Sequence, residues 1–264
     1  MRPLFLWCTT DLRRIWLDKK LVGGDAVKDF EPLYGSVYLP RKFKIAVAVP
    51  PHNDVDIYTN DVGFIAIVDP ASGDLAGFNV TIGGGMGVTH GNTKTYPRLG
   101  DVIGYVDLGR AIDVAEKVML VQRDNGDRTN RKHARLKYTI DTMGLDVFKA
   151  EVEKRLGYRL EPARPFEFTH NTDAFGWAQG HDGNWHFTAF IENGRVEDAP
   201  GKEFKTALRE IAKIHTGVFR LTANQHLVIA DVTPEQKPKI QALLEQYKLD
   251  DVNFSVRRAS LWLL

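Results

Sequence analysis

The stretch Arg41-Lys42-Phe43-Lys44-Ile45-Ala46-Val47-Ala48-Val49 decides the fold of the first half of the chain. Its apolar run predicts a core strand that ends at Pro50-Pro51, because proline interrupts a sheet. Residues i and i+2 of a strand share one face, so Lys42 and Lys44 are expected to point the same way, with Arg41 beside them. Clustered like charges repel one another, and we interpret these cations as a pocket for a small anion or an acidic cofactor. A sheet edge that lysine protects from aggregation is the alternative.

The residues after this stretch predict two more strands and a glycine-rich turn. Strands over 63–68 and 75–82 are joined by a hairpin connection at 70–74. The second strand runs into Gly83-Gly84-Gly85-Met86-Gly87, which completes neither the dinucleotide fingerprint nor the P-loop. Consecutive glycines let backbone amides approach a ligand closely, or provide φ angles that other residues avoid. A flexible loop is the alternative.

A change to a helical pattern follows Pro97. Asp107 is the predicted N-cap of the first helix, and Gly157 is the predicted stop of the last. The expected helices run from about 107 to 124, from 128 to 143 and from 145 to 156. The run Glu161-Pro162-Ala163-Arg164-Pro165 is typical of a domain linker.

The helix expected over 128–143 is strongly basic. Arg128, Arg131 and Arg135 stand at i, i+3 and i+7, so they would share one helix face. The planar arginine fork matches carboxylates, and we interpret this face as an anion-facing stripe. A solvated surface and an RNA-binding helix are the alternatives.

The part of the chain after the linker has a different order of predicted strands and helices. His181-Asp182-Gly183-Asn184 predicts a hairpin. The expected order is strands at 175–179 and 185–191, a helix at 203–215, strands at 218–222 and 226–230, and a helix at 234–247. Paired strands and single helices in this order predict a small α+β ferredoxin-like sandwich.

The segment Thr222-Ala223-Asn224-Gln225 separates the last two expected strands. Asn224 and Gln225 carry amide groups that both donate and accept hydrogen bonds. They are interpreted either as a simple turn or as contacts to the polar edge of a cofactor.

Composition narrows the class of protein. The chain has 264 residues, 43% of them hydrophobic and 26% charged, which fits a folded protein of one large or two modest domains. A formal charge of +1 gives no global basic field, which argues against nucleic acid as the main partner. The single cysteine, Cys8, excludes a disulfide framework or an all-cysteine metal site within this chain and is compatible with a reducing cytoplasm. No run approaches the length of a membrane span.

Several landmarks together resemble the sulfite/nitrite reductase family, in particular its assimilatory hemoprotein (beta) subunits. They occur in family order between about residues 13 and 250, which makes the match far more specific than any single motif. The matching stretches are Ile15-Trp16-Leu17-Asp18, Tyr38-Leu39-Pro40-Arg41-Lys42-Phe43-Lys44, Asn53-Asp54-Val55-Asp56, Gly77-Phe78-Asn79, Gly83-Gly84-Gly85, Thr95-Tyr96-Pro97-Arg98, Gln122-Arg123-Asp124, Arg128-Thr129-Asn130-Arg131-Lys132 and Thr222-Ala223-Asn224-Gln225.

The resemblance implies a fold class and a domain order. It implies a mixed-sheet α/β siroheme-binding domain over 13–165, followed by a ferredoxin-like α+β half-domain over 166–249. Residues 1–12 would be a divergent start, and 250–264 a truncated tail.

The resemblance also implies a reaction and its residues. Family members reduce sulfite to sulfide at siroheme, with electrons arriving through a 4Fe–4S cluster. Lys42 and Lys44 fall on the family's active-site lysines and would neutralise the substrate and support proton delivery. The expected siroheme-binding residues are Arg41, Gly83, Gly84, Gly85, Arg128, Arg131, Arg135, Asn224 and Gln225. Sulfite or nitrite would be the substrate, and a flavoprotein using NADPH or a ferredoxin would be the electron donor.

One departure from the family concerns the cluster. Its four cysteine ligands should begin just after Ser255-Val256-Arg257-Arg258-Ala259-Ser260, where this chain instead continues with Leu261-Trp262-Leu263-Leu264. The family's N-terminal substrate-side domain is also absent before Met1. We therefore expect no metal ligands here and a partial subunit that needs other chains to supply the cluster. The alternatives are an inactive remnant, a nitrite reductase fragment or, from the arginines alone, an RNA-binding module.

Overall fold

The computed structural model describes residues 15–17, 20–23 and 32–250. The predicted divergent start, with Cys8, and all but the first residue of the predicted tail lie outside these residues. The described chain divides into two compact units. One comprises the described residues up to Ala46 together with Tyr58–Arg164, and the other comprises Val47–Ile57 together with the described residues from Pro165 onward. The predicted domains did not anticipate that Val47–Ile57 groups with the second unit.

The first unit is built on a four-stranded sheet in the order β3-β4-β5-β6, whose strand β3 continues two residues past Ala46. The strands are β3 (Ile45–Ala48), β4 (Val62–Val68), β5 (Leu75–Ile82) and β6 (Asp101–Asp107). Strands β4 and β5 pair in antiparallel fashion, as do β5 and β6. A separate antiparallel pair is formed by β1 (Ile15–Leu17) and β2 (Lys20–Gly23), and a short 3-10 turn, η1, spans Ile57–Thr59.

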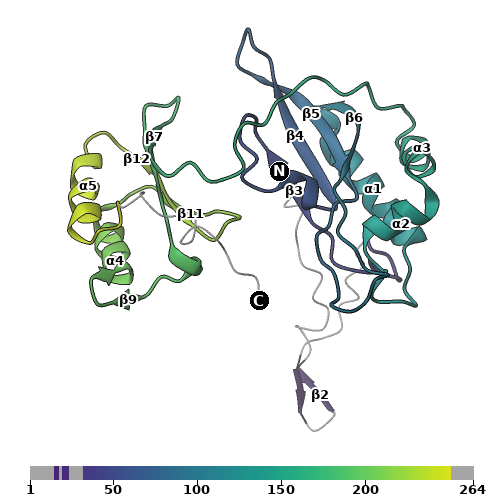
Figure 1. Cartoon of the computed structure of the whole chain (residues 1–264), viewed down its shortest axis with the longest axis horizontal. Coiled ribbons are helices and arrows are strands. Elements are labelled where there is room, and N and C mark those ends of the chain that lie inside the picture. Colours follow the sequence, from purple (N-terminus) through teal and green to yellow (C-terminus); the bar gives the residue numbers. More distant parts are fainter. Residues whose placement is uncertain (1–14, 18–19, 24–31, 251–264) are drawn as a thin grey trace. The chain divides into compact units, whose positions relative to one another are not determined.

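Three helices cover one face of this sheet (Figure 1). A 3-10 turn, η2 (Leu108–Arg110), leads into α1 (Ala111–Asn125), which is followed by α2 (Leu136–Met143) and α3 (Leu145–Leu156). Apolar side chains from the sheet and the helices, among them Val80, Val118 and Phe148, form one buried core. Helix α3 ends as predicted, because Gly157 adopts the left-handed conformation (φ +77°) and its amide donates to the carbonyl of Glu153 at 2.9 Å.

Strand β6 corrects the expectation that the chain turns helical directly after Pro97. Residues 101–107 pair with β5, and Ile103, Tyr105 and Val106 are buried in the sheet. Asp107 therefore ends a strand, and the regular helix begins only at Ala111. The prediction missed this strand because its apolar run is short and Gly104 interrupts it.

The basic helix expected over 128–143 is half as long in the structure. The carboxylate of Asp127 accepts hydrogen bonds from the amides of Thr129 and Asn130 and from the Thr129 hydroxyl, and the Asn130 side chain accepts from the Lys132 amide. These local bonds give the backbone an alternative to a helix, which begins only at Leu136. The predicted stripe of arginines along one helix face is therefore wrong.

The predicted linker at 161–165 is attached to the first unit along most of its length. Glu161 and Tyr105 exchange backbone hydrogen bonds of 2.8 and 3.1 Å. The backbone of Arg164 binds the side chain of Asn79, and its guanidinium lies 3.6 Å from the ring centroid of Tyr105. The division between the two units follows directly, at Pro165.

The second unit is a four-stranded antiparallel sheet in the order β11-β12-β8-β7, packed against two helices (Figure 1). Its strands are β7 (Gly176–Gln179), β8 (Trp185–Ala189), β11 (Val218–Leu221) and β12 (Leu227–Val232), and its helices are α4 (Phe204–Ile214) and α5 (Lys237–Gln246). A turn, η3 (Glu192–Gly194), and a small pair, β9 (Asp198–Ala199) with β10 (Lys202–Glu203), complete it. The hairpin predicted at 181–184 joins β7 to β8. None of the helices among the described residues is long and apolar enough to cross a lipid bilayer.

Candidate functional site

A cavity of about 460 Å³ in the first unit is lined by five cationic side chains, and we call it the cation cavity. Two segments far apart in sequence supply the charges. The lining residues are Arg41, Lys42, Gly87, Val88, Thr89, Thr95, Arg131, Lys132, Arg135 and Tyr138. No acidic residue is among them, so the cavity concentrates positive charge in a concave surface that favours anions.

Four of the five charges have no ionic partner within the described part of the chain. Arg41, Lys42, Arg131 and Lys132 form no ion pair with any residue that the structure describes, whereas Arg135 pairs with Asp61. Repulsion among unpaired cations costs stability, and an anion that enters the cavity would remove that repulsion.

Asp61 links the cavity to the segment that carries Lys42 and Lys44. Its side chain is fully buried, and Oδ2 accepts hydrogen bonds from the Arg135 guanidinium and from the Lys44 amide, both at 2.9 Å. Burial raises the pKa of the Asp61 carboxyl, while Arg135 and Lys44 act in the opposite direction. Asp61 Oδ1 and Arg135 Nε are buried without a hydrogen-bond partner among the described residues. This pair fixes Arg135 at the wall of the cavity.

The two predicted catalytic lysines do not belong to the strand itself, because β3 begins only at Ile45. The alternation of strand faces therefore does not place them side by side. Both lysines are exposed, but Lys42 lines the cation cavity, whereas Lys44 is not among the lining residues and is held through its backbone by Asp61. Their catalytic role stays a prediction.

The three consecutive glycines serve packing rather than offering free amides. The amides of Gly83, Gly84 and Gly85 donate to the backbone carbonyls of Asp61, Asn60 and Arg98 at 2.8–2.9 Å. Gly83 adopts φ +82°, an angle that other residues avoid, which is one of the two roles that the sequence suggested for these glycines. A Cβ on Gly84 would lie 2.1 Å from the Tyr58 carbonyl oxygen, and one on Gly85 would lie 2.8 Å from an Arg135 nitrogen. Gly85 thus makes room for Arg135, and none of the three consecutive glycines is among the lining residues.

Arg128 lies apart from the cation cavity. Its guanidinium donates to the carbonyl oxygen of Tyr38 at 2.8 Å and to carbonyls at the end of α1. These bonds satisfy backbone groups that a helix end leaves open. Arg128 was predicted to bind a cofactor, and in the structure it holds the end of α1.

Asn224 and Gln225 lie in the second unit, in the turn between β11 and β12. The Asn224 side chain donates to a carboxylate oxygen of Asp173 and to the carbonyl of Asp54, both at 3.0 Å. Gln225 has φ +67°, and its amide donates to the Thr222 carbonyl. The turn interpretation therefore accounts for the local geometry of both residues, and their role toward a cofactor stays a prediction.

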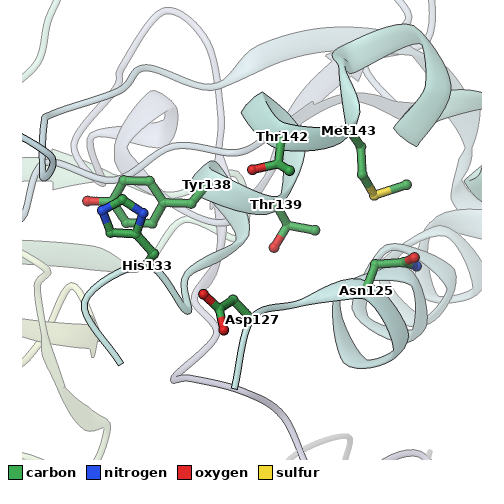
Figure 2. Close-up of a pocket in the computed structure, with 7 residues that line it drawn as sticks. All are labelled: Asn125, Asp127, His133, Tyr138, Thr139, Thr142 and Met143. Atoms are coloured by element: carbon green, nitrogen blue, oxygen red, sulfur yellow. The ribbon is translucent and has the colours of Figure 1, made fainter. Parts of the chain in front are cut away.

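A smaller cavity of about 170 Å³ shares Tyr138 with the cation cavity. Figure 2 shows that the imidazole of His133 lies over the Tyr138 ring and that the Thr139 hydroxyl points toward Asp127. The two rings are nearly parallel, with centroids 4.6 Å apart. Among the described residues, no group of three or more His, Cys, Asp or Glu side chains converges as it would around a metal ion.

Lys137 is the main residue that the sequence argument did not single out as part of a site. It lies at the start of α2 and is only 1% exposed, and its ammonium contacts the glycine-rich loop. A lysine between Leu136 and Tyr138, one turn before Ile140, is surrounded by apolar neighbours on a helix, and that pattern was the available signal.

Comparisons with known proteins agree with this geometry. The family described as "Nitrite and sulphite reductase 4Fe-4S domain" matches residues 6–160, and the "Nitrite/Sulfite reductase ferredoxin-like half domain" matches residues 178–247. The chain is 59% identical over 249 residues to the sulfite reductase (NADPH) hemoprotein beta-component of Anoxybacillus flavithermus, and 57% identical over 250 residues to that of Myxococcus xanthus. Each match covers 94% of this chain and 43% of the relative, so the chain spans less than half the length of these proteins.

A solved structure shares the same architecture. The NirA protein of Mycobacterium tuberculosis matches with a TM-score of 0.68 at 29% sequence identity, over 83% of this chain and 38% of that one. Together with the family matches, this likeness confirms the predicted fold class of an α/β region followed by a ferredoxin-like α+β unit. The chain belongs to the nitrite and sulphite reductase family.

Proposed function

We propose that this chain supplies the siroheme- and oxyanion-binding part of a sulfite reductase. The observation that carries the proposal is the cation cavity, a space of about 460 Å³ lined by Arg135 and by four cations that form no ion pair with any described residue. Relatives more than 50% identical are named as sulfite reductase hemoprotein components, which supports sulfite as the substrate. Nitrite is the alternative substrate, because the matching family includes nitrite reductases.

Siroheme carries many carboxylate groups, and the residues of the cavity suit such a group. Arginine binds a carboxylate through two parallel hydrogen bonds, and lysine adds a point charge. Arg41, Arg131 and Arg135 would hold carboxylates of the macrocycle, and Lys132 would add charge at the same wall. The glycine turn would act indirectly, by leaving space for Arg135.

Lys42 and Lys44 are the residues to which we assign the reaction itself. Bound siroheme supplies the iron centre at which the six-electron reduction of sulfite to sulfide takes place. An ammonium group at the substrate attracts the oxyanion and stabilises negative charge as it develops. It also donates a proton as each oxygen leaves as water. Lys42 lines the cavity, and Asp61 accepts a hydrogen bond from the backbone amide of Lys44.

The 4Fe–4S cluster does not fit the residues of this chain. Such a cluster takes four cysteine thiolates, and the sequence contains one cysteine, Cys8. Electron delivery therefore requires residues beyond these 264. The names of the relatives favour NADPH as the ultimate donor, which implies a flavoprotein partner, with ferredoxin as the alternative. A single cysteine is compatible with a cytoplasmic location.

Titration of siroheme into the purified chain tests the proposal. The absorption band of the bound macrocycle is expected to shift and sharpen at a one-to-one stoichiometry, because a defined polar site replaces water around the cofactor. Excess sulfate or phosphate should weaken binding by competing for the same cations. A folded chain whose addition leaves the siroheme spectrum unchanged would refute the proposed function.

A further inference from the structure

The ammonium of Lys137 is buried beneath the loop that forms one wall of the cation cavity. The loop, residues 85–98, is closed by paired backbone hydrogen bonds between Gly85 and Arg98 of 2.8 and 3.0 Å. Lys137 Nζ donates to the carbonyl oxygens of Gly85 at 2.9 Å, Gly87 at 3.0 Å and Tyr96. An ammonium has three donors and no acceptor, so these three bonds use all of them.

The three carbonyls come from both arms of the loop. Gly85 and Gly87 lie on the arm that leaves β5, and Tyr96 lies on the arm that returns to β6. One ammonium therefore ties the two arms together. A second contact from α2 supports the same loop, because Asp141 accepts hydrogen bonds from the Tyr96 hydroxyl and from Arg98, both at 2.8 Å.

The tied loop contributes directly to the cation cavity. Gly87, Val88, Thr89 and Thr95 are lining residues, whereas Lys137 is not. The hydroxyl of Thr95 accepts from the Thr89 amide at 2.8 Å, so the two arms also contact each other at the cavity. Displacement of either arm would change the shape of this wall and its distance from Lys42 and Arg131.

The buried position of Lys137 is explained by the need for a charged ammonium, which can donate to all three carbonyls at once. Burial and the nearby Arg135 both lower the pKa of its ammonium. A neutral amine has two protons and could donate to only two of the three carbonyls. An apolar side chain would donate to none of them, so the Gly87 and Tyr96 carbonyls would lose the donor that Lys137 supplies, whereas the Gly85 carbonyl would keep the Arg98 amide at 3.0 Å.

We propose that Lys137 is a positioning residue, whose ammonium holds the 85–98 loop in the shape that completes the cation cavity, without itself contacting the bound anion. This inference rests on the proposed function for its effect on siroheme, but its effect on the loop is independent of any ligand.

The test compares Lys137→Ala with Lys132→Ala, which removes an equal charge from the cavity wall. Hydrogen exchange of the 85–98 amides and siroheme titration are measured for both chains. Lys137→Ala is expected to accelerate exchange in the loop and weaken siroheme binding by roughly tenfold or more each, as expected from losing charge-assisted hydrogen bonds. Lys132→Ala should weaken siroheme binding and leave loop exchange unchanged.

Chemical rescue distinguishes the hydrogen bonds that Lys137 donates from a general effect of its positive charge. Propylammonium replaces the atoms that Lys137→Ala removes, including the three N–H donors, whereas tetramethylammonium carries the charge without donors. Propylammonium should restore slow exchange and siroheme affinity, and tetramethylammonium at equal concentration should restore neither. Unchanged loop exchange in folded Lys137→Ala, or equal rescue by both cations, would overturn the inference.

The role of Lys137 can still be decided if the wild-type chain does not bind siroheme or if Lys137→Ala does not fold. If wild-type chain does not bind siroheme, the proposed function fails, and loop exchange with its rescue still decides the role of Lys137. If Lys137→Ala does not fold, Lys137→Arg keeps the charge on a planar group that cannot reach three converging carbonyls in the same way. Faster loop exchange in Lys137→Arg supports the inference, and exchange at the wild-type rate contradicts it.

Discussion

Replacement of Gly84 by alanine is expected to lower the free energy of unfolding by about 3 kcal/mol or more, because the new methyl group has no space. Its Cβ would lie 2.1 Å from the carbonyl oxygen of Tyr58 and 2.6 Å from that of Asn60. Both obstacles are backbone atoms, and both accept hydrogen bonds from the same region, since Tyr58 binds the Gly100 amide and Asn60 binds the Gly84 amide. Relief of the clash must therefore break bonds that shape the turn.

Gly87→Ala is the matched control for this prediction. Gly87 lies in the same turn, but no atom of the described residues lies within 4 Å of the position its Cβ would take, and its φ is not positive. The free energy of unfolding of Gly87→Ala should stay within about 1 kcal/mol of the wild-type value. Urea unfolding followed by far-ultraviolet circular dichroism measures both variants. Equal stabilities for Gly84→Ala and Gly87→Ala would show that the turn is a loose loop.

Removal of the Asp61 carboxylate should lower the free energy of unfolding by an amount comparable to that expected for Gly84→Ala. Asp61→Ala leaves the Arg135 guanidinium, 14% exposed, without its ionic partner and the Lys44 amide without its acceptor. Loss of one member of a buried ion pair costs about 3–5 kcal/mol, and the partial exposure of Arg135 places our expectation near the lower end. The same urea titration gives the value.

Two companion variants make the Asp61 result specific. Asp101→Ala removes an ion pair with Arg98 that is partly exposed, 41% for the Asp101 side chain, and should cost at most about 1 kcal/mol. The double variant Asp61→Ala/Arg135→Met should be less destabilised than the sum of its single changes, because no uncompensated charge remains. Strict additivity of the two changes would mean that Asp61 and Arg135 are not coupled.

The sequence predicted much of the secondary structure and the order of the units. Strands β4 and β5, helix α3 and the elements of the second unit were expected close to their observed ranges. These elements have strong local signals, such as Gly157 at the end of α3 or the turn residues at 181–184. Strand β6 was missed because its apolar run is short and is interrupted by Gly104, and the start of α2 was missed because side-chain bonds from Asp127 outweigh local helix propensity there.

The candidate site was predicted in part. Arg41, Lys42, Arg131 and Arg135 meet in one cavity, but the helix face expected to align the arginines does not exist, because α2 begins only at Leu136. Asp61 was not singled out, and Lys137 was considered only as one cation of the basic segment 128–143, because the sequence alone does not show which charges the fold buries. Their roles can be recognised only in the folded chain, where Asp61 contacts Arg135 and Lys137 contacts the 85–98 loop.

The central claim is that the charges of the cation cavity bind the cofactor, and siroheme titration of a neutralised cavity tests it most directly. Lys42→Met/Arg131→Met removes two cations from the lining, and Lys149→Met/Lys154→Met removes two from α3, away from the lining residues. We predict that the cavity variant binds siroheme about a hundredfold more weakly than wild type, at roughly 1.5 kcal/mol for each lost charge-assisted contact, and that the α3 variant binds as wild type does. Equal siroheme affinities for the two double variants would contradict the claim.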